Sequence, residues 1–193
     1  MKPFDLYLCG VGGQGIGLLS EILLRAADYA GYAAKAVDTH GLAQRGGVVI
    51  SHVRLGTVIH SPLIPERSAD LVIGLERHEA LRGVQTALRD GGTLIYYDTV
   101  LQPLGVRLGT APEVSCSDIE QTCKDRGISV HQVAYPQLTD PRMQNIAVLA
   151  RIDQLHLVPE VTTAHYLQAM DDLMEGEMLN GNMRLFEEAK QHQ

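Results

Sequence analysis

Six residues near the start of the chain, Gly10-Val11-Gly12-Gly13-Gln14-Gly15, have the spacing of a phosphate-binding turn. An apolar run, residues 4–9, precedes them, and an apolar-periodic segment, residues 16–30, follows. This order predicts a strand, a glycine turn and a helix. In that context glycines allow a tight turn and a close ligand approach, and the N–H groups at the helix start favour anions. The candidate cofactor-binding residues here are Gly10, Gly12, Gly13, Gln14 and Gly15.

Three interpretations of this turn stay open. The turn can bind a phosphate group, with Gln14 as an added side-chain donor. It can receive a loop of a partner protein, or it can simply make the corner between strand and helix. Asp38 follows a second expected strand, residues 33–37, near the place where dinucleotide-binding folds carry their ribose-binding acid.

A second glycine-containing segment reads His40-Gly41-Leu42-Ala43-Gln44-Arg45-Gly46-Gly47. Two glycines after an arginine indicate backbone that bends sharply or is approached closely. The guanidinium of Arg45 can clamp a carboxylate or phosphate, or it can brace the loop against a carboxylate such as Asp38. His40 can carry a proton, or it can be a surface or capping residue. Arg45, Gly46 and Gly47 join the candidate cofactor-binding residues, and no catalytic set is assigned.

Composition excludes several function classes. The 193 residues include 16 Lys and Arg against 23 Asp and Glu, a net charge of −7, which offers no basic surface for nucleic acid or membranes. No apolar run is long enough to span a bilayer and no signal-peptide layout is present, so we expect a cytoplasmic protein. Cys9, Cys116 and Cys123 form no C-x-x-C pair, so we expect neither a disulfide framework nor a metal site. We interpret Cys9 as a small buried residue.

Alternating strands and helices predict an α/β fold: a Rossmann-like, mostly parallel sheet with helices on both faces. We expect an inserted β-hairpin after the second strand, made by residues 48–55 and 57–60 and joined at Gly56. Ser117 and Glu120 have the spacing of a capping box that opens a helix ending at Gly127. Further strands are expected at 70–75, 93–97 and 128–134, and helices at 77–88, 145–157, 160–174 and 183–189. We predict a single domain, 1–193, with a C-terminal helical extension at about 158–193.

Several of these segments together resemble one family. They are the glycine turn, segment 40–47, the hairpin ending Ser51-His52-Val53-Arg54-Leu55-Gly56, residues 60–65, and Asp140-Pro141-Arg142-Met143-Gln144-Asn145. The chain resembles the gamma-type subunit of 2-oxoacid:ferredoxin oxidoreductases, and within that group the beta subunit of indolepyruvate:ferredoxin oxidoreductase. The similarity covers most of the chain in register.

The resemblance implies a small subunit of a thiamine-diphosphate- and CoA-dependent enzyme. That enzyme converts indolepyruvate or other arylpyruvates to acyl-CoA and CO2 and reduces ferredoxin. Thiamine diphosphate, Mg and iron–sulfur clusters are expected on a large alpha subunit, with CoA as co-substrate and ferredoxin reached through the complex. This sequence lacks a Gly-Asp-Gly motif with paired asparagines and lacks cysteines spaced for clusters. We therefore expect this chain to be inactive alone.

Two other function classes remain open. Gly10, Gly12, Gly15 and Asp38 also suit an independent Rossmann-type NAD(P)-dependent dehydrogenase. The hairpin expected after the second strand counts against it, as does the absence of a Tyr-x-x-x-Lys motif. A stand-alone nucleotide-binding module is the third possibility.

Overall fold

The computed structural model describes residues 3–40, 47–101, 109, 112–138 and 140–191. Six strands form one sheet in the order β2-β3-β1-β4-β5-β6. The strands are β1 (Phe4–Val11), β2 (Ala33–His40), β3 (Val48–Gly56), β4 (Ala69–Gly74), β5 (Leu88–Tyr97) and β6 (Ser129–Val133). Strands β1, β4, β5 and β6 are parallel to one another, whereas β3 runs antiparallel to both of its neighbours, β1 and β2.

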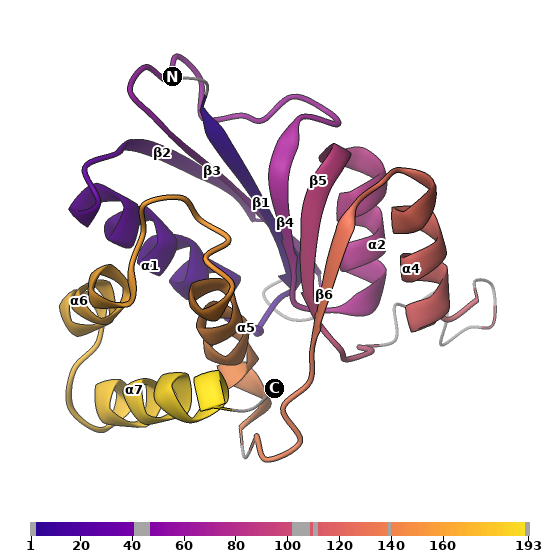
Figure 1. The fold of residues 1–193 in the computed structure, drawn as a ribbon. Helices are drawn as coiled ribbons and strands as arrows, with labels where there is room; N and C mark the ends of the chain where they lie inside the picture. Colours follow the sequence, from indigo (N-terminus) through magenta and orange to yellow (C-terminus); the bar gives the residue numbers. More distant parts are fainter. Residues whose placement is uncertain (1–2, 41–46, 102–108, 110–111, 139, 192–193) are drawn as a thin grey trace.

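Helices cover both faces of the sheet (Figure 1). The helices are α1 (Ile16–Tyr29), α2 (Arg77–Thr86), α4 (Cys116–Asp125), α5 (Gln144–Gln154), α6 (Thr163–Leu173) and α7 (Gly176–Gln191), with the 3-10 turn η1 (Pro141–Met143) before α5. α1, α5, α6 and α7 lie on one face, and α2 and α4 lie on the other. The predicted fold class, a mostly parallel Rossmann-like sheet, is confirmed.

The side chains of β1 show how one strand supplies two cores. Leu6 and Leu8 are buried in the core beneath α1, α5, α6 and α7. Tyr7 and Cys9 are buried in the smaller core beneath α2 and α4. Successive side chains of a strand point to opposite faces, so an almost wholly apolar strand is needed where both faces are covered. The interpretation of Cys9 as a buried residue is confirmed.

The inserted hairpin differs from the prediction in one respect. Residues 57–60 form no strand, and the hairpin partner of β3 is β2, with Ala33 opposite Gly56 and His40 opposite Val49. Beyond Gly56 the chain is held as a loop, because Arg54 donates to the carbonyl oxygens of Ser61 (3.1 Å) and Leu63 (3.3 Å). The expected strand at 57–60 is therefore wrong, and β3 occupies the space between β2 and β1.

Three element boundaries also differ from the sequence prediction. The capping box of α4 is made by Ser115 and Asp118, whose side chains each accept from the other's backbone N–H, and not by Ser117 and Glu120. Both pairs have the required spacing, but Ser115 has the extended backbone of a cap. β5 begins at Leu88, ahead of the expected residue 93, and α7 begins at Gly176, ahead of the expected residue 183.

A buried charged cluster joins the three C-terminal helices. The Asp153 carboxylate of α5 accepts from Lys190 Nζ of α7 (2.7 Å) and from Thr163 Oγ1 of α6 (2.7 Å). Its side chain is 1% exposed. A buried carboxylate of this kind requires its cation, because removal of one partner leaves an uncompensated charge.

Replacing Lys190 tests this cluster. Lys190→Met should lower the free energy of unfolding by about 3 kcal/mol, because Asp153 would lose its cation while remaining buried. Arg184→Met is the matched control, since Arg184 pairs with Glu188 at 3.9 Å on the exposed side of the same helix. It should change stability by less than about 0.5 kcal/mol. Urea denaturation measures both, and equal values for the two variants would contradict this account.

Candidate functional site

The glycine turn joins the carboxyl ends of β1 and β4 through the side chain of Gln14. Gln14 Oε1 accepts from the N–H of Val11 (2.6 Å), and Nε2 donates to the carbonyl oxygen of Leu75 (2.7 Å). Gln144, at the start of α5, donates to the same carbonyl (3.2 Å). The Gln14 side chain is buried. Its polar atoms are therefore engaged within the protein.

This bridge lies at the point where the strand order reverses. From β1 the chain crosses one face through α1, and from β4 it crosses the opposite face through α2. In open α/β sheets, ligands bind in the crevice at this switch point. Here the side-chain amides of Gln14 and Gln144 both donate to the carbonyl oxygen of Leu75 between the two strand ends. These side chains therefore span the crevice.

The two glycine-containing segments predicted from the sequence meet in the fold. The N–H of Gly12 donates to the carbonyl oxygen of Gly47 (2.9 Å). His40 ends β2. Arg45 and Gly46 lie outside the described residues, so their predicted role stays a prediction. If the turn binds a phosphate, its backbone N–H groups are the expected donors. The N–H of Gly12 is already bonded to Gly47 and is therefore not available for this.

Two glycines of the turn are required by their surroundings. A Cβ atom at Gly10 would lie 2.7 Å from Gln14 Oε1 and 2.9 Å from Ile16 Cδ1. Gly15 has φ +79°, in the left-handed region, and a Cβ there would lie 2.5 Å from Asn145 Nδ2. Gly15 thus both turns the chain into α1 and lets the start of α5 approach.

A pocket of about 460 Å³ opens beside the turn. Its walls come from the turn and α1, from η1 and the start of α5, and from α7, and include Gly13, Gly15, Leu18, Arg142, Asn145 and Met178. Sequence reasoning placed Gly13 and Gly15 in the site but missed the walls from 140–145 and α7. The Asp-Pro-Arg-Met-Gln-Asn segment was a usable signal, whereas nothing in the sequence of α7 indicated that it reaches the turn.

The N-terminus of α1 gives this pocket an attraction for anions. No side chain caps the helix, and its first turn contains no acidic residue. The partial positive charge of the helix start is therefore not offset by its own residues. Three charged residues also line the pocket: Arg142 Nη2 lies 2.7 Å from Asp140 Oδ2, whereas Glu177 of α7 forms no ion pair within the described residues. Hydrogen bonds from Arg142 lower the pKa of the Asp140 carboxyl.

Asn145 connects the pocket wall to the turn. Its Nδ2 donates to the carbonyl oxygen of Gly15 (3.2 Å), and its Oδ1 accepts from the N–H of Ile146 (2.9 Å). The residue is 3% exposed. The start of α5 is therefore hydrogen-bonded to the start of α1 beside the pocket.

Asp38 does not have the neighbours of a ribose-binding acid. In a dinucleotide-binding fold the second strand lies beside the first. Here β3 separates β2 from β1, and Asp38 lies opposite Ser51 of β3. One oxygen of Asp38 is buried without a hydrogen-bond partner in the described part of the chain.

Among the described residues, no group of three or more His, Cys, Asp or Glu side chains is arranged to hold a metal ion. Within the same residues, no helix has the length and apolar character needed to cross a membrane.

Comparison with known proteins gives a consistent result. The family described as pyruvate ferredoxin/flavodoxin oxidoreductase matches residues 5–192. The chain is 34% identical over 125 residues to indolepyruvate oxidoreductase subunit IorB of Pyrococcus horikoshii, covering 65% of this chain and 61% of that protein. It is 45% identical over 108 residues to IorB of Archaeoglobus fulgidus, covering 55% and 52%. The chain thus spans about three fifths of the length of the curated relatives it matches.

Solved structures share the fold at lower identity. The gamma subunit of a keto/oxoacid ferredoxin oxidoreductase from Geobacter sulfurreducens has a TM-score of 0.66 at 18% identity, with 97% of this chain and 96% of that chain covered. A 2-oxoglutarate:ferredoxin oxidoreductase from Magnetococcus marinus has a TM-score of 0.68 at 16% identity, with 98% of this chain and 31% of that chain covered. In the second case the fold is one part of a longer polypeptide.

Two glycine substitutions at the start of α1 should have opposite effects. Gly15→Ala should destabilise the chain by about 1–3 kcal/mol, because it adds a side chain at positive φ and against Asn145. Gly17→Ala should stabilise by about 0.5–1 kcal/mol, because Gly17 lies in the helix with nothing within 4 Å of its added Cβ. Denaturant titration of both variants checks this. A Gly15→Ala protein as stable as the wild type would show that Asn145 can move aside.

Proposed function

Because the chain belongs to the pyruvate ferredoxin/flavodoxin oxidoreductase family, we propose that it is the small subunit of a thiamine-diphosphate- and CoA-dependent indolepyruvate:ferredoxin oxidoreductase. The observation that carries the substrate assignment is the identity, up to 45%, with proteins named indolepyruvate oxidoreductase subunit IorB. Other arylpyruvates belong to the same proposed substrate class. The complex is proposed to be cytoplasmic.

The proposed reaction is the oxidative decarboxylation of a 2-oxoacid. The 2-oxoacid and CoA give acyl-CoA and CO2, and the two electrons released reduce ferredoxin. A large partner subunit would carry thiamine diphosphate, Mg and the iron–sulfur clusters. This allocation is supported by the cysteine spacing of this chain and by its lack of a Gly-Asp-Gly motif with paired asparagines. The small subunit would then shape or complete the partner's active site.

We propose that the pocket beside the glycine turn receives a phosphate of CoA. Support comes from the uncapped N-terminus of α1, and from Gly13 and Gly15, which line the pocket. Gly12 and Gln14 would act indirectly by holding the turn in shape, since each is bonded within the chain. The alternative, contact with the partner subunit, is supported by the exposed side chain of Met178 on the same pocket. We retain Arg45, Gly46 and Gly47 as the neighbouring part of this proposed site.

The dehydrogenase alternative has less support. Its motif, G-x-G-x-x-G, is present, but β3 separates Asp38 from the first strand. The switch-point crevice is also bridged by Gln14 and Gln144. We therefore do not favour nicotinamide binding.

The proposal predicts that activity requires the partner. The purified chain should be colourless and inactive with every 2-oxoacid tested. Adding the large subunit of the same organism should give CoA-dependent ferredoxin reduction, highest with indolepyruvate in a panel that includes pyruvate, 2-oxoglutarate and phenylpyruvate. Brown iron–sulfur absorbance or decarboxylation by this chain alone would overturn the proposal, and preference for an aliphatic 2-oxoacid would overturn the substrate assignment.

A paired substitution tests the phosphate interpretation of the pocket. Leu18 lies in the first turn of α1 and lines the pocket. Leu18→Glu should raise the KM for CoA in the assembled enzyme about tenfold over Leu18→Gln, because only the carboxylate competes with a phosphate for the helix N-terminus. The two side chains are nearly isosteric, so lost packing is the same in both. Equal KM values would instead favour a partner contact.

A further inference from the structure

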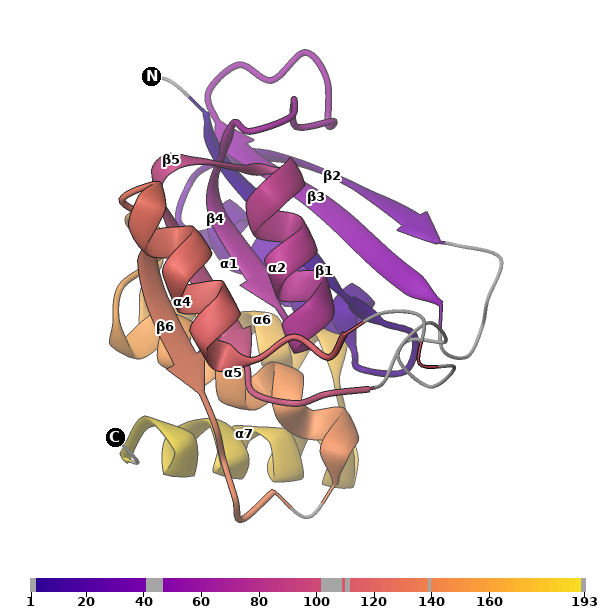
Figure 2. The same ribbon diagram turned by 90° about the vertical axis from the view of Figure 1, so that its right-hand side faces the viewer.

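The outer edge of β2 is an open strand edge. β2 pairs with β3 in continuous register from Ala33 to His40, and in the described part of the chain no strand pairs with its other edge. Figure 2 shows β2 and β3 extending beyond α2 at the margin of the sheet. Native proteins protect such edges with Pro, bulges or several charges. β2 contains no Pro, and its charged residues are Lys35 and Asp38.

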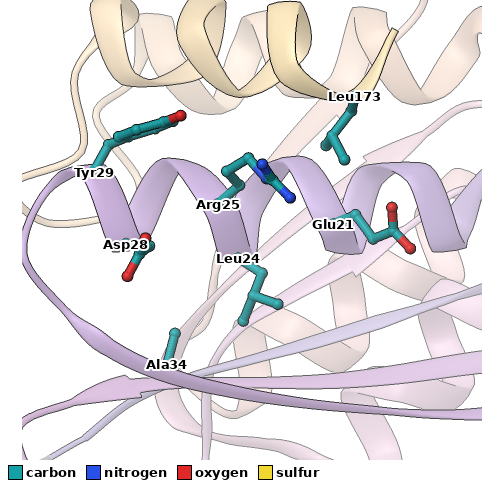
Figure 3. Close-up of a pocket in the computed structure, with 7 residues that line it drawn as sticks. All are labelled: Glu21, Leu24, Arg25, Asp28, Tyr29, Ala34 and Leu173. Atoms are coloured by element: carbon teal, nitrogen blue, oxygen red, sulfur yellow. The ribbon is translucent and has the colours of Figure 1, made fainter.

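A pocket of about 600 Å³ adjoins this edge (Figure 3). Three of its lining residues are the apolar side chains of Leu24 on α1, Ala34 on β2 and Leu173 on α6. In Figure 3, Leu24 points from α1 towards the strand that carries Ala34, and Tyr29 lies on the side of α6. The open edge and the pocket therefore share Ala34 and form one continuous surface.

The charges around this pocket are unbalanced. Arg25 pairs with Asp172 at 3.0 Å, and Tyr29 donates to the same carboxylate. That leaves Glu21 and Asp28, which are exposed on α1 and have no ion-pair partner in the described residues. Two negative charges therefore border an apolar floor, and the chain as a whole carries a net charge of −7. The complementary occupant is a segment with basic side chains.

We propose that an extended, basic segment of the large partner subunit adds a strand to the outer edge of β2 and places Lys or Arg side chains beside Glu21 and Asp28, on either side of Arg25. Backbone hydrogen bonds to β2 would supply affinity, and the pocket beside Ala34 would supply specificity. The identity of the partner rests on the proposed function, whereas the surface itself does not.

A second copy of this chain fits the surface less well. Two β2 edges paired about a two-fold axis would place both α1 helices on the same face of the joined sheet. Glu21 and Asp28 of one copy would then approach those of the other, and like charges repel. Lys35 cannot offset them, because it neighbours Ala34 in the strand and so points to the opposite face.

The surface can be tested without the partner by NMR titration of the full chain. The probe is a short peptide that alternates valine with lysine, and a peptide that alternates valine with glutamate is its control. The lysine peptide should give saturable shifts in residues 33–37 and 21–28, and Glu21→Lys/Asp28→Lys should weaken its binding about tenfold. Glu120→Lys/Glu187→Lys, with the same charge change on exposed positions of α4 and α7, should not. Shifts elsewhere, or equal weakening by both double variants, would overturn the proposal.

Assembly with the large subunit then separates this inference from the proposed function. Wild-type and control chains should form the complex, and Glu21→Lys/Asp28→Lys should bind the large subunit about tenfold more weakly. If that variant binds as well as the control, the docking surface is wrong while the proposed function stands. If no variant binds the large subunit but the lysine peptide still binds β2, the proposed function fails and the surface stands. A wild-type dimer that pairs through β2 would identify a second copy as the occupant and overturn the proposal.

Discussion

The amide of Gln14 fixes the geometry on which the rest of the glycine turn depends. One side chain accepts from Val11 at the end of β1 and donates to Leu75 after β4, so the two parallel strand ends are held together across the switch point. A buried amide needs both of its polar ends satisfied, and here one partner ends β1 while the other directly follows β4. The start of α1 that follows the turn lines the pocket shared with α5 and α7. The glycine motif that binds a dinucleotide in other proteins is therefore tied here by hydrogen bonds of its own Gln14 side chain.

The pocket beside the turn is built from several elements. The pocket wall comes from segments far apart in the sequence, and Asn145 links them by donating to Gly15. Because α5 and α7 are held together through Asp153 and Lys190, the C-terminal helices contribute to the shape of a site that begins near residue 10. The Magnetococcus structure, in which the fold is one part of a longer chain, shares the fold at 16% identity with a TM-score of 0.68. The fold therefore depends on the packing pattern far more than on individual residues.

The sequence was sufficient for the parts of the fold that depend on local periodicity. The apolar run of β1, the glycine turn and α1 follow from spacing alone, as does the mostly parallel sheet. The prediction failed where two residues had equally suitable spacing for a helix cap, as at Ser115 and Ser117. It also failed where tertiary packing outweighed the helix propensity of the sequence. Gly181 and Asn182 weaken the helical signal of α7, yet Phe186 is fully buried and holds that helix in place. The engagement of Gln14 could not be predicted, because its partner Leu75 is far away in the sequence, directly after β4. For the same reason the pocket walls beyond Gly13 and Gly15 were missed.

The antiparallel insertion of β3 between β2 and β1 also has a consequence for synthesis of the chain. All the strand partners of β3 precede it, so the pairing of β1, β2 and β3 can be completed once Gly56 has left the ribosome. The other side of that unit matures much later, because α1 packs against α6, which begins at Thr163. A nascent chain that pairs these three strands early would expose the apolar surface of α1 until α6 has been synthesised. Such an exposed, partly folded surface is what chaperones bind. The strand order thus separates, along the sequence, the pairing of β1, β2 and β3 from the residues that cover α1.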